Sequence, residues 1–314
     1  MSGRILVLGA AGRLGRIAAE AFRNDGWTVA SLTRGRSIRA VAPGTEPIEA
    51  DARDVDAVVA AARGADVILH ALNPPYTLWP RLMLPFTDAA IAAAHAAGAT
   101  LLFPGNLYNY GRDMPEVLDE TTPMHPTSRK GLLRIEAEGR LRDATATGVR
   151  SIVLRAGDFY GGSGVGSWFD RIILKDLGNG RVTYPGPLDV VHEWAYLPDL
   201  AATMVKLAGV RDRLEPYAEF GFAGHAVTGG ELVSAMVKSM GRNLRATTMP
   251  WWIMRLLAPV VPIFRELSEI SYLWSVPHRI AGDKLHAAID ELPATPFQVA
   301  VTAALAELGA PVRP

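Results

Sequence analysis

The sequence contains no cysteine in 314 residues. This absence excludes disulfide bonds, a thiol nucleophile and thiolate metal ligands. An excess of one charge is missing as well, because 32 basic residues balance 32 acidic residues. A net charge of zero provides no general attraction to nucleic acid or to an anionic membrane. We therefore expect neither of these as a partner.

Long apolar runs without charges are also absent. The nearest is residues 250–274, which Arg255, Arg265 and Glu266 interrupt. A membrane-spanning helix needs about 18 apolar residues in a row, and the basic face of this segment is poor for an interfacial helix. The N-terminus enters a predicted strand at once, without a leader pattern, and the seven histidines show no metal-binding spacing. We expect a cytoplasmic protein without a metal site.

The sequence does contain a glycine-rich turn close to its N-terminus. Apolar residues 5–8 lead directly into Gly9, Gly12 and Gly15, and an alanine-rich segment with helical character follows. Glycine lets a backbone turn tightly and approach a pyrophosphate, whose charge the helix N-terminus then attracts. A glycine-rich turn in an ordinary strand–helix unit is the alternative. The pattern predicts a dinucleotide-binding loop made of Gly9, Ala11, Gly12, Arg13, Leu14 and Gly15.

Apolar strands and helices alternate through the first half of the chain, which is typical of a doubly wound parallel sheet. Beyond Gly157 the alternation fades and proline becomes frequent. We predict an α/β fold, a Rossmann-like doubly wound parallel sheet with a small C-terminal α+β cap. Residues 1–160 would form the dinucleotide-binding domain, with later sheet elements near 188–225, and residues 161–314 the substrate-binding cap region. Predicted strands are 4–8, 28–32, 46–50, 66–71, 100–104 and 151–155, and predicted helices are 13–24, 55–63, 85–97 and 128–145.

Two arginines follow the second predicted strand, where an NAD-specific site normally has an acidic residue for the ribose 2′-hydroxyl. Arg34 and Arg36 instead suit a 2′-phosphate, because guanidinium groups pair bidentately with phosphate. Arg13 could add to this site. These residues favour NADP over NAD as the cofactor. The alternative is that Arg34 and Arg36 are ordinary solvated charges of a surface loop and bind no ligand.

The ends of the third and fourth predicted strands supply further candidate ligands. Asp51 and Ala52 lie where a carboxylate can accept a hydrogen bond from the adenine amino group, although capping of the next helix is a rival role that Asp54 fits better. Leu72 and Asn73 should line the pyrophosphate and the nicotinamide ribose, because ligands lie beyond the carboxyl ends of such strands.

With these features the chain resembles the extended or atypical short-chain dehydrogenases/reductases, the group related to nucleoside-diphosphate-sugar epimerases. The resemblance extends over nearly the whole chain and implies the same fold and NAD(P) binding. It rests on the glycine loop, on Asp51 and on the segments Phe103–Gly111, Asp119–Pro123, Leu154–Gly161 and Trp194–Ala201.

The catalytic motif of that family is missing. The family places Ser or Thr after the fifth strand and Tyr-x-x-x-Lys on the next long helix, and aligning the flanking residues puts Asn106, Lys130 and Arg134 at these three positions. None of the five lysines has tyrosine four residues earlier. A guanidinium cannot exchange protons usefully. Lys130 could replace the tyrosine only if Arg134 and burial lowered its pKa, and otherwise it would bind phosphate or stabilise the fold.

Two hypotheses about function follow from this departure. In the first, the chain is an NADP-linked oxidoreductase or epimerase-like enzyme acting on a small carbonyl or hydroxyl compound, with Asn106, Tyr108, Lys130 and Arg134 as its catalytic residues and Tyr110 as another candidate phenol. In the second, it senses NADP(H) without turnover. Aromatic residues of the second half would either line an apolar substrate pocket or pack as core. Helices 85–97 and 128–145 match the family's dimer contact, which makes a homodimer the expected assembly.

Overall fold

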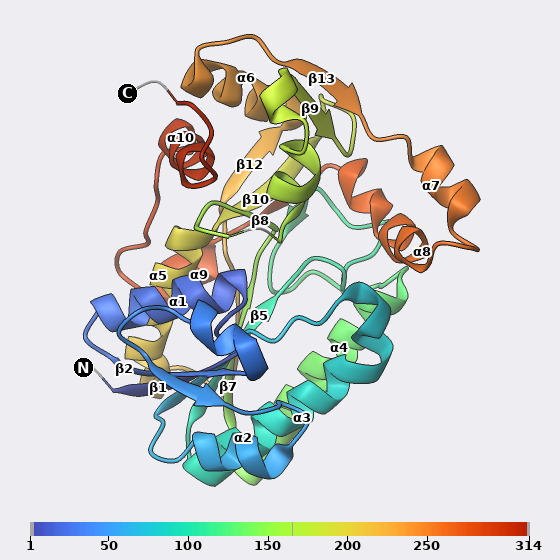
Figure 1. The fold of residues 1–314 in the computed structure, drawn as a ribbon. Helices are drawn as coiled ribbons and strands as arrows, with labels where there is room; N and C mark the ends of the chain where they lie inside the picture. The colour runs from blue at the N-terminus through green and yellow to red at the C-terminus, as the bar shows by residue number, and fades with distance from the viewer. Residues whose placement is uncertain (1–2, 165, 313–314) are drawn as a thin grey trace.

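The computed structural model describes residues 3–164 and 166–312, and its centre is a sheet of seven parallel strands (Figure 1). The order across the sheet is β3-β2-β1-β4-β5-β7-β11. The chain therefore moves outward in one direction from β1 and then crosses back to β4, which creates a switch point beside β1. The predicted α/β, Rossmann-like fold is confirmed. The strands are β1 Arg4–Leu8, β2 Thr28–Thr33, β3 Glu46–Glu49, β4 Val67–His70, β5 Thr100–Gly105, β7 Arg150–Arg155 and β11 Tyr217–Gly221.

Helices cover both faces of this sheet, and the alternation of β1 shows why. Ile5 and Val7 belong to the core on one face, whereas Leu6 and Leu8 belong to the core on the other, and all four are fully buried. Since side chains along a strand point to opposite faces, a strand that is apolar at every position needs a helical layer on each side. Helices α1 (Arg13–Asn24) and α5 (Leu197–Val210) form one layer, and α2 (Val55–Ala61), α3 (Trp79–Ala97) and α4 (Arg129–Asp143) form the other.

The start of α3 differs from the prediction. The sequence indicated a helix over residues 85–97. In the structure the helix begins at Trp79, Pro80 occupies the first turn, where proline is favoured, and Pro85 lies inside the helix. Four alanines of α3 belong to the core on the helix's own sheet, so small residues here serve packing within the chain; the homodimer stays a prediction. They are Ala89, Ala90, Ala93 and Ala94.

The C-terminal region covers the carboxyl end of the central sheet (Figure 1). It is not separate from that sheet, because β11 joins the edge of β7 and α5 packs on α1. The other elements of the C-terminal region are β8 Asp158–Tyr160, β9 Arg181–Tyr184, β10 Val191–Tyr196, β12 His225–Thr228, α6 Gly229–Met240, β13 Arg245–Thr248, α7 Trp251–Leu257, α8 Pro262–Glu269, β14 Arg279–Ile280, α9 Asp283–Ala288 and α10 Phe297–Glu307, with β14 pairing to β6 Val117–Leu118.

None of the helices in the described ranges is both long and apolar enough to span a bilayer.

Aromatic side chains form much of the core of this region. Trp274 lies within 6 Å of the ring centres of Trp168, Tyr184 and Trp194, and all four side chains are less than a tenth exposed. The sequence left open whether such residues line a substrate pocket or pack together. For these four, the structure favours packing, because each ring is covered by the others.

Candidate functional site

The glycine loop lies between β1 and α1 and has the geometry of an anion-binding turn. Gly9 has a φ of +81°, a left-handed conformation that favours glycine. A Cβ on Gly15 would come within 2.4 Å of the Gly9 carbonyl oxygen, so only glycine lets α1 pack onto the turn. Gly12 is the N-cap of α1, where neither a side-chain cap nor an acidic first-turn residue occupies the helix end. The amide groups around Ala11 to Leu14 are thus placed to meet phosphate.

Arg13 connects this loop to the C-terminal region. Its guanidinium forms an ion pair with Asp170, donates to Oγ of Ser167 at 2.8 Å and donates to the carbonyl oxygen of Gly161 at 3.1 Å. Both charged side chains are less than a tenth exposed. The Arg13 side chain is therefore committed to this contact, and the geometry does not favour the predicted contribution of Arg13 to a 2′-phosphate site.

Arg34 and Arg36 lie at the end of β2 with their side chains exposed. Neither guanidinium forms an ion pair or hydrogen bond within the described part of the chain. The charge of Arg34 acts on Asp51 at the end of the neighbouring strand β3. Two uncommitted cations thus stand beside the position expected for the adenosine ribose, where a phosphate would find them free.

Asp51 is held by its neighbour Arg53. The Arg53 side chain donates to both carboxylate oxygens at 2.5–3.0 Å, and its backbone N–H donates at 2.9 Å. The side-chain hydrogen bonds, then the backbone hydrogen bond, lower the pKa of Asp51 to about 2, and the charge of Arg34 contributes. Asp51 is therefore an ionised acceptor at neutral pH. Asp54 caps α2 by accepting from the N–H of Ala57, as the sequence indicated, which leaves Asp51 free of that role.

The segment after β4 begins with Leu72 and Asn73. Leu72 is half-buried and Asn73 is exposed, with its Oδ1 accepting from the indole Nε1 of Trp79 at 3.2 Å. Ala52, after β3, is buried. The predicted cofactor residues from four strand ends therefore gather along one edge of the sheet, on both sides of the switch point beside β1.

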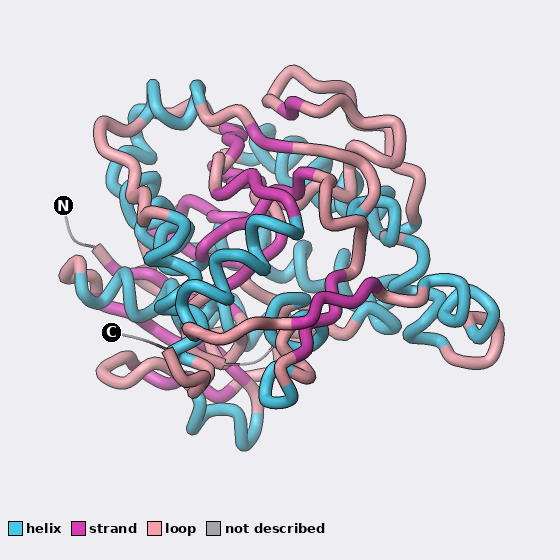
Figure 2. Tube along the Cα trace, turned by 90° about the horizontal axis from the view of Figure 1, so that it is seen from above, coloured by secondary structure: helices cyan, strands magenta, loops and turns pink. Residues whose placement is uncertain are grey.

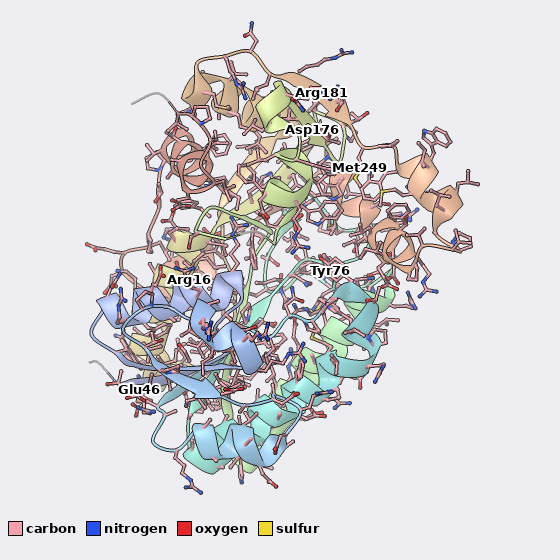
Figure 3. All side chains as sticks on the ribbon, in the orientation of Figure 1. Arg16, Glu46, Tyr76, Asp176, Arg181 and Met249 are labelled. Carbon is pink, nitrogen blue, oxygen red and sulfur yellow. The ribbon has the colours of Figure 1, made fainter. Side chains whose placement is uncertain are left out.

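Two tyrosines from neighbouring strand ends meet at this edge. The hydroxyl oxygen of Tyr76, six residues beyond β4, lies 2.8 Å from that of Tyr108, three residues beyond β5. The backbone N–H of Tyr108 donates to Oδ1 of Asn106 at 3.1 Å, which leaves the Asn106 amide nitrogen for another partner. In Figure 3, Tyr76 lies between the helical layer of α3 and α4 and the C-terminal region above it. Tyr110 lies apart from this pair, over the guanidinium of Arg155.

Burial keeps both phenols of this pair protonated. It raises the pKa of Tyr76 to about 12, although the hydrogen bond with Tyr108 acts to lower it. It also raises the pKa of Tyr108 well above its ordinary value, and the nearby Tyr76 and Asp158 add to the shift. Only one hydrogen lies between two hydroxyl oxygens that share a hydrogen bond. The pair therefore retains one O–H that can be donated elsewhere.

Arg134 lies beside the tyrosine pair and forms no ion pair within 4 Å among the described residues. Its guanidinium carbon is 5.1 Å from the ring centre of Trp79 and 5.2 Å from that of Phe103, while Nη1 donates to the carbonyl oxygen of Pro104 at 3.1 Å. Its buried Nε has no hydrogen-bond partner in the part of the chain that the structure describes. After burial itself, the charge of Arg134 is the main factor lowering the pKa of His70 to about 3. The charge of Glu138 acts on Arg134, but the carboxylate of Glu138 is ion-paired with Arg155, so the Arg134 cation can stabilise negative charge that develops nearby.

Lys130 is placed differently from the prediction. Its ammonium group lies between two carboxylates of α8, forming ion pairs with Glu266 and, at 2.8 Å, with Glu269. The side chain is 1% exposed, and Nζ lies over the ring of Tyr76 at 5.3 Å. Because its ammonium group is held by Glu266 and Glu269, the geometry does not favour Lys130 as a proton donor or as a cofactor ligand, and it supports the alternative that Lys130 stabilises the fold.

Sequence reasoning missed Tyr76 and a second pair from the C-terminal region. Nε2 of His192 on β10 lies 2.9 Å from Oδ2 of Asp158 on β8, and the imidazole stacks on Trp274 at 4.2 Å. The charge of Asp158 acts on both Tyr76 and Tyr108. The only sequence signal for Tyr76 was its position shortly after a buried strand. Nothing in the sequence indicated that the Asp158–His192 pair would face it.

Comparison with known proteins gives the chain a family context. Residues 5–220 match the family model described as the NAD dependent epimerase/dehydratase family. A curated relative, the 3-diazoavenalumate denitrifying reductase of a Streptomyces species, is 31% identical over 175 residues. That match covers 50% of this chain and 57% of the relative, so the chain spans only a little over half of that protein's length.

Solved structures share the fold at low sequence identity. The UDP-glucose 4-epimerase from Brucella ovis, in complex with NAD, superimposes with a TM-score of 0.78 at 16% identity, over 99% of this chain and 100% of the other. The UDP-glucose 4-epimerase from Bifidobacterium longum, in complex with NAD+ and UDP, gives a TM-score of 0.76 at 16% identity, over 97% of both chains. At such identity the likeness concerns the fold alone.

Proposed function

The chain belongs to the NAD dependent epimerase/dehydratase family, and we propose that it is an NADP-linked reductase of a small carbonyl or related electrophilic compound. The observation that carries this proposal is the Tyr76–Tyr108 pair beside Arg134, at the place where the family's Tyr-x-x-x-Lys motif is missing. The pair offers a protonated phenol next to a cation that has no ion pair of its own among the described residues. That combination suits a reaction in which an oxygen or nitrogen atom of the substrate gains negative charge.

NADPH, when bound, supplies a hydride. Tyr76 is the more accessible of the two phenols, so we assign it the donation of a proton to the substrate atom that becomes negative. Tyr108 holds the Tyr76 hydroxyl in place, and the Asn106 amide nitrogen can donate a hydrogen bond to the same substrate atom. Arg134 stabilises the charge before the proton arrives. Lys130 has no part in this step.

The protonation state of the pair favours reduction over oxidation. Phenols with raised pKa values give a proton to an alkoxide, but at neutral pH they cannot accept one from an alcohol. An epimerase needs both directions at one site. The reductase named among the curated relatives agrees with the reductive direction, whereas the UDP-sugar epimerases share only the fold.

The cofactor residues that support NADP are the exposed, uncommitted Arg34 and Arg36. The glycine loop from Gly9 to Gly15 would hold the pyrophosphate, Asp51 would accept from the adenine amino group, and Ala52, Leu72 and Asn73 would line the remainder. A second candidate function, a sensor of NADP(H) without turnover, rests on the missing catalytic motif.

One experiment separates these functions. The protein is incubated with NADPH and a panel of aldehydes, ketones, conjugated acids and aromatic diazo compounds, and absorbance of NADPH is followed. The proposal expects oxidation of NADPH with at least one class and loss of that activity in Tyr76→Phe. Tight NADPH binding without turnover on any class favours the sensor. In a parallel incubation with the oxidised dinucleotide and a sugar nucleotide, conversion of the sugar to its epimer without net reduction of the cofactor favours an epimerase.

A further inference from the structure

Helices α7 and α8 with their connection, residues 250–269, form a helical hairpin at the margin of the molecule (Figures 1 and 2). This hairpin carries six of the ten large apolar side chains that are exposed in the described residues. Surface apolar side chains are normally scattered, so their concentration on one protruding element marks an interaction surface. The exposed fractions are Trp252 68%, Ile253 37%, Leu256 71%, Leu257 38%, Val260 76% and Ile263 40%.

The opposite side of α7 is already packed. Met254 is 5% exposed, and Nε1 of Trp251 donates to the carbonyl oxygen of Pro185 at 2.5 Å. The Trp251 ring also lies 6.1 Å from that of Trp168. Since the inner face is fixed by these contacts, Trp252 and Leu256 face away from the protein. The helix therefore has apolar side chains on its outer face as well as on its packed inner face, and the outer ones call for an apolar environment.

The charges of the hairpin are divided between its two faces. Glu266 is 3% exposed and Glu269 is half-buried, and both carboxylates turn inward to Lys130 and Arg129 on α4. Arg255 and Arg265 remain exposed, although Arg265 also lies 3.5 Å from Glu266 and Arg255 donates to Oγ of Ser271 at 3.3 Å. From the sequence alone, Glu266 offset the two arginines and the segment had a poor basic face. In the structure Glu266 and Glu269 are already paired with Lys130 and Arg129, so positive charge is in excess on the outer side of the hairpin.

From this surface we propose that the hairpin docks onto an anionic phospholipid membrane. Trp252 and its aliphatic neighbours would enter the boundary between headgroups and acyl chains, while Arg255 and Arg265 would meet lipid phosphates, as amphipathic interfacial helices do. The protein would lie on the membrane without spanning it. This replaces the sequence-based expectation of no membrane partner, and it does not depend on the proposed reaction.

The hairpin is also continuous with the tyrosine site. Helix α8 contacts the turn Tyr76–Leu78, and Lys130 links Glu266 to the ring of Tyr76. Docking through the hairpin would therefore bring the turn Tyr76–Leu78 toward the lipid surface.

The absence of cysteine allows a specific test. Leu256→Cys is labelled with an environment-sensitive fluorophore and mixed with vesicles of phosphatidylcholine alone or with added phosphatidylglycerol. We expect a blue shift with the anionic vesicles that weakens as salt is raised. Val299→Cys, another exposed apolar site on α10 at 56% exposure against 71% for Leu256, is the matched control and should show no shift.

Cosedimentation of the unlabelled protein with the same vesicles completes the design. Trp252→Glu combined with Leu256→Glu should reduce binding about tenfold or more, while Val299→Glu leaves it unchanged. Absence of wild-type binding to anionic vesicles overturns the proposal. So does a self-association in light scattering that Trp252→Glu abolishes while vesicles have no effect, because that result assigns the surface to a second copy of the chain.

Discussion

The hydroxyl oxygens of Tyr76 and Tyr108 lie 2.8 Å apart. They come from segments that follow the adjacent parallel strands β4 and β5. The carboxyl ends of parallel strands meet at one edge of a sheet, so side chains separated by 32 residues are brought together there. The family motif that would supply a phenol from α4 is missing, and this pair presents a phenol beside Lys130, which occupies the position of the family's tyrosine.

We predict that Tyr76→Phe lowers turnover about 10²–10⁴-fold, the usual contribution of a general acid. Cofactor affinity should hardly change, because the phenol does not belong to the loop that binds phosphate. Tyr108→Phe should have a smaller effect, since it removes only the partner that positions Tyr76. Steady-state kinetics and calorimetric titration of NADPH measure the two quantities. Tyr110→Phe is the matched control, as Tyr110 is buried over Arg155, away from the pair.

The same pair makes a prediction for pH. With the pKa of Tyr76 at about 12, the donor stays protonated across the neutral and mildly alkaline range. Titration of Tyr76 should therefore cause no fall in the rate of reduction as pH rises through this range. If the wild-type rate falls with rising pH below pH 9 and the Tyr76→Phe variant lacks that fall, the assignment of Tyr76 as proton donor is contradicted.

Lys130→Met should lower the free energy of unfolding and leave the chemical step unaffected. Removing one partner of a buried ion pair typically costs about 3–5 kcal/mol, because the other charge stays buried without compensation. Here the substitution leaves Glu266 and Glu269 of α8 with Arg129 and, for Glu266, the exposed Arg265 as their remaining cations. Urea unfolding measures the loss. Adding Glu266→Gln to Lys130→Met should recover part of it, and a stable variant with weakened NADPH binding would instead make Lys130 a cofactor ligand.

The Lys130 pairs also give stability a dependence on acid pH. Burial works against the charged form of Glu266, but the hydrogen bond from Lys130 and the nearby charges outweigh it and hold the pKa of Glu266 below 4.5. A carboxyl whose pKa is lower in the folded state contributes stability above its unfolded pKa and loses it as pH falls through the folded pKa. Unfolding free energy should therefore fall on acidification below about pH 4.5, and less steeply in Glu266→Gln.

Much of the first half could be predicted from the sequence because each local pattern agrees with its burial. The segment Arg4–Leu8 is apolar and buried on both faces, and α4 begins at Arg129, with Ser128 as its N-cap, within one residue of the predicted start at 128. The partners of Lys130 could not be predicted, since Glu266 lies 136 residues further along the chain. Tyr76 was missed for a related reason, because its role depends on a contact with Tyr108 that only the sheet order creates.

Two substitutions in the glycine loop should separate folding from cofactor binding. A Cβ on Gly15 meets the Gly9 carbonyl oxygen at 2.4 Å, so Gly15→Ala should destabilise the fold by displacing α1. A Cβ on Gly12 meets only that oxygen, at 3.1 Å, and otherwise enters the space left for pyrophosphate. Gly12→Val should therefore abolish dinucleotide binding with most of the stability retained. Thermal unfolding and calorimetric titration distinguish the two, and a folded Gly12→Val variant that still binds cofactor would contradict the placement of the loop.

The choice of cofactor depends on whether Arg34 and Arg36 receive a 2′-phosphate. A charge-assisted contact of this kind contributes roughly 1.5–3 kcal/mol, or about tenfold or more in affinity. We expect calorimetry to show tighter binding of NADP than of NAD, and Arg34→Ala to remove most of the difference by weakening NADP alone. Arg39→Ala is the matched control, because Arg39 is an exposed arginine of the same turn, Gly35–Ala40, at its far end. Equal affinities in the wild type, or an equal loss in both variants, would show that these arginines are ordinary surface charges and that the site takes NAD, the dinucleotide seen in the solved relatives.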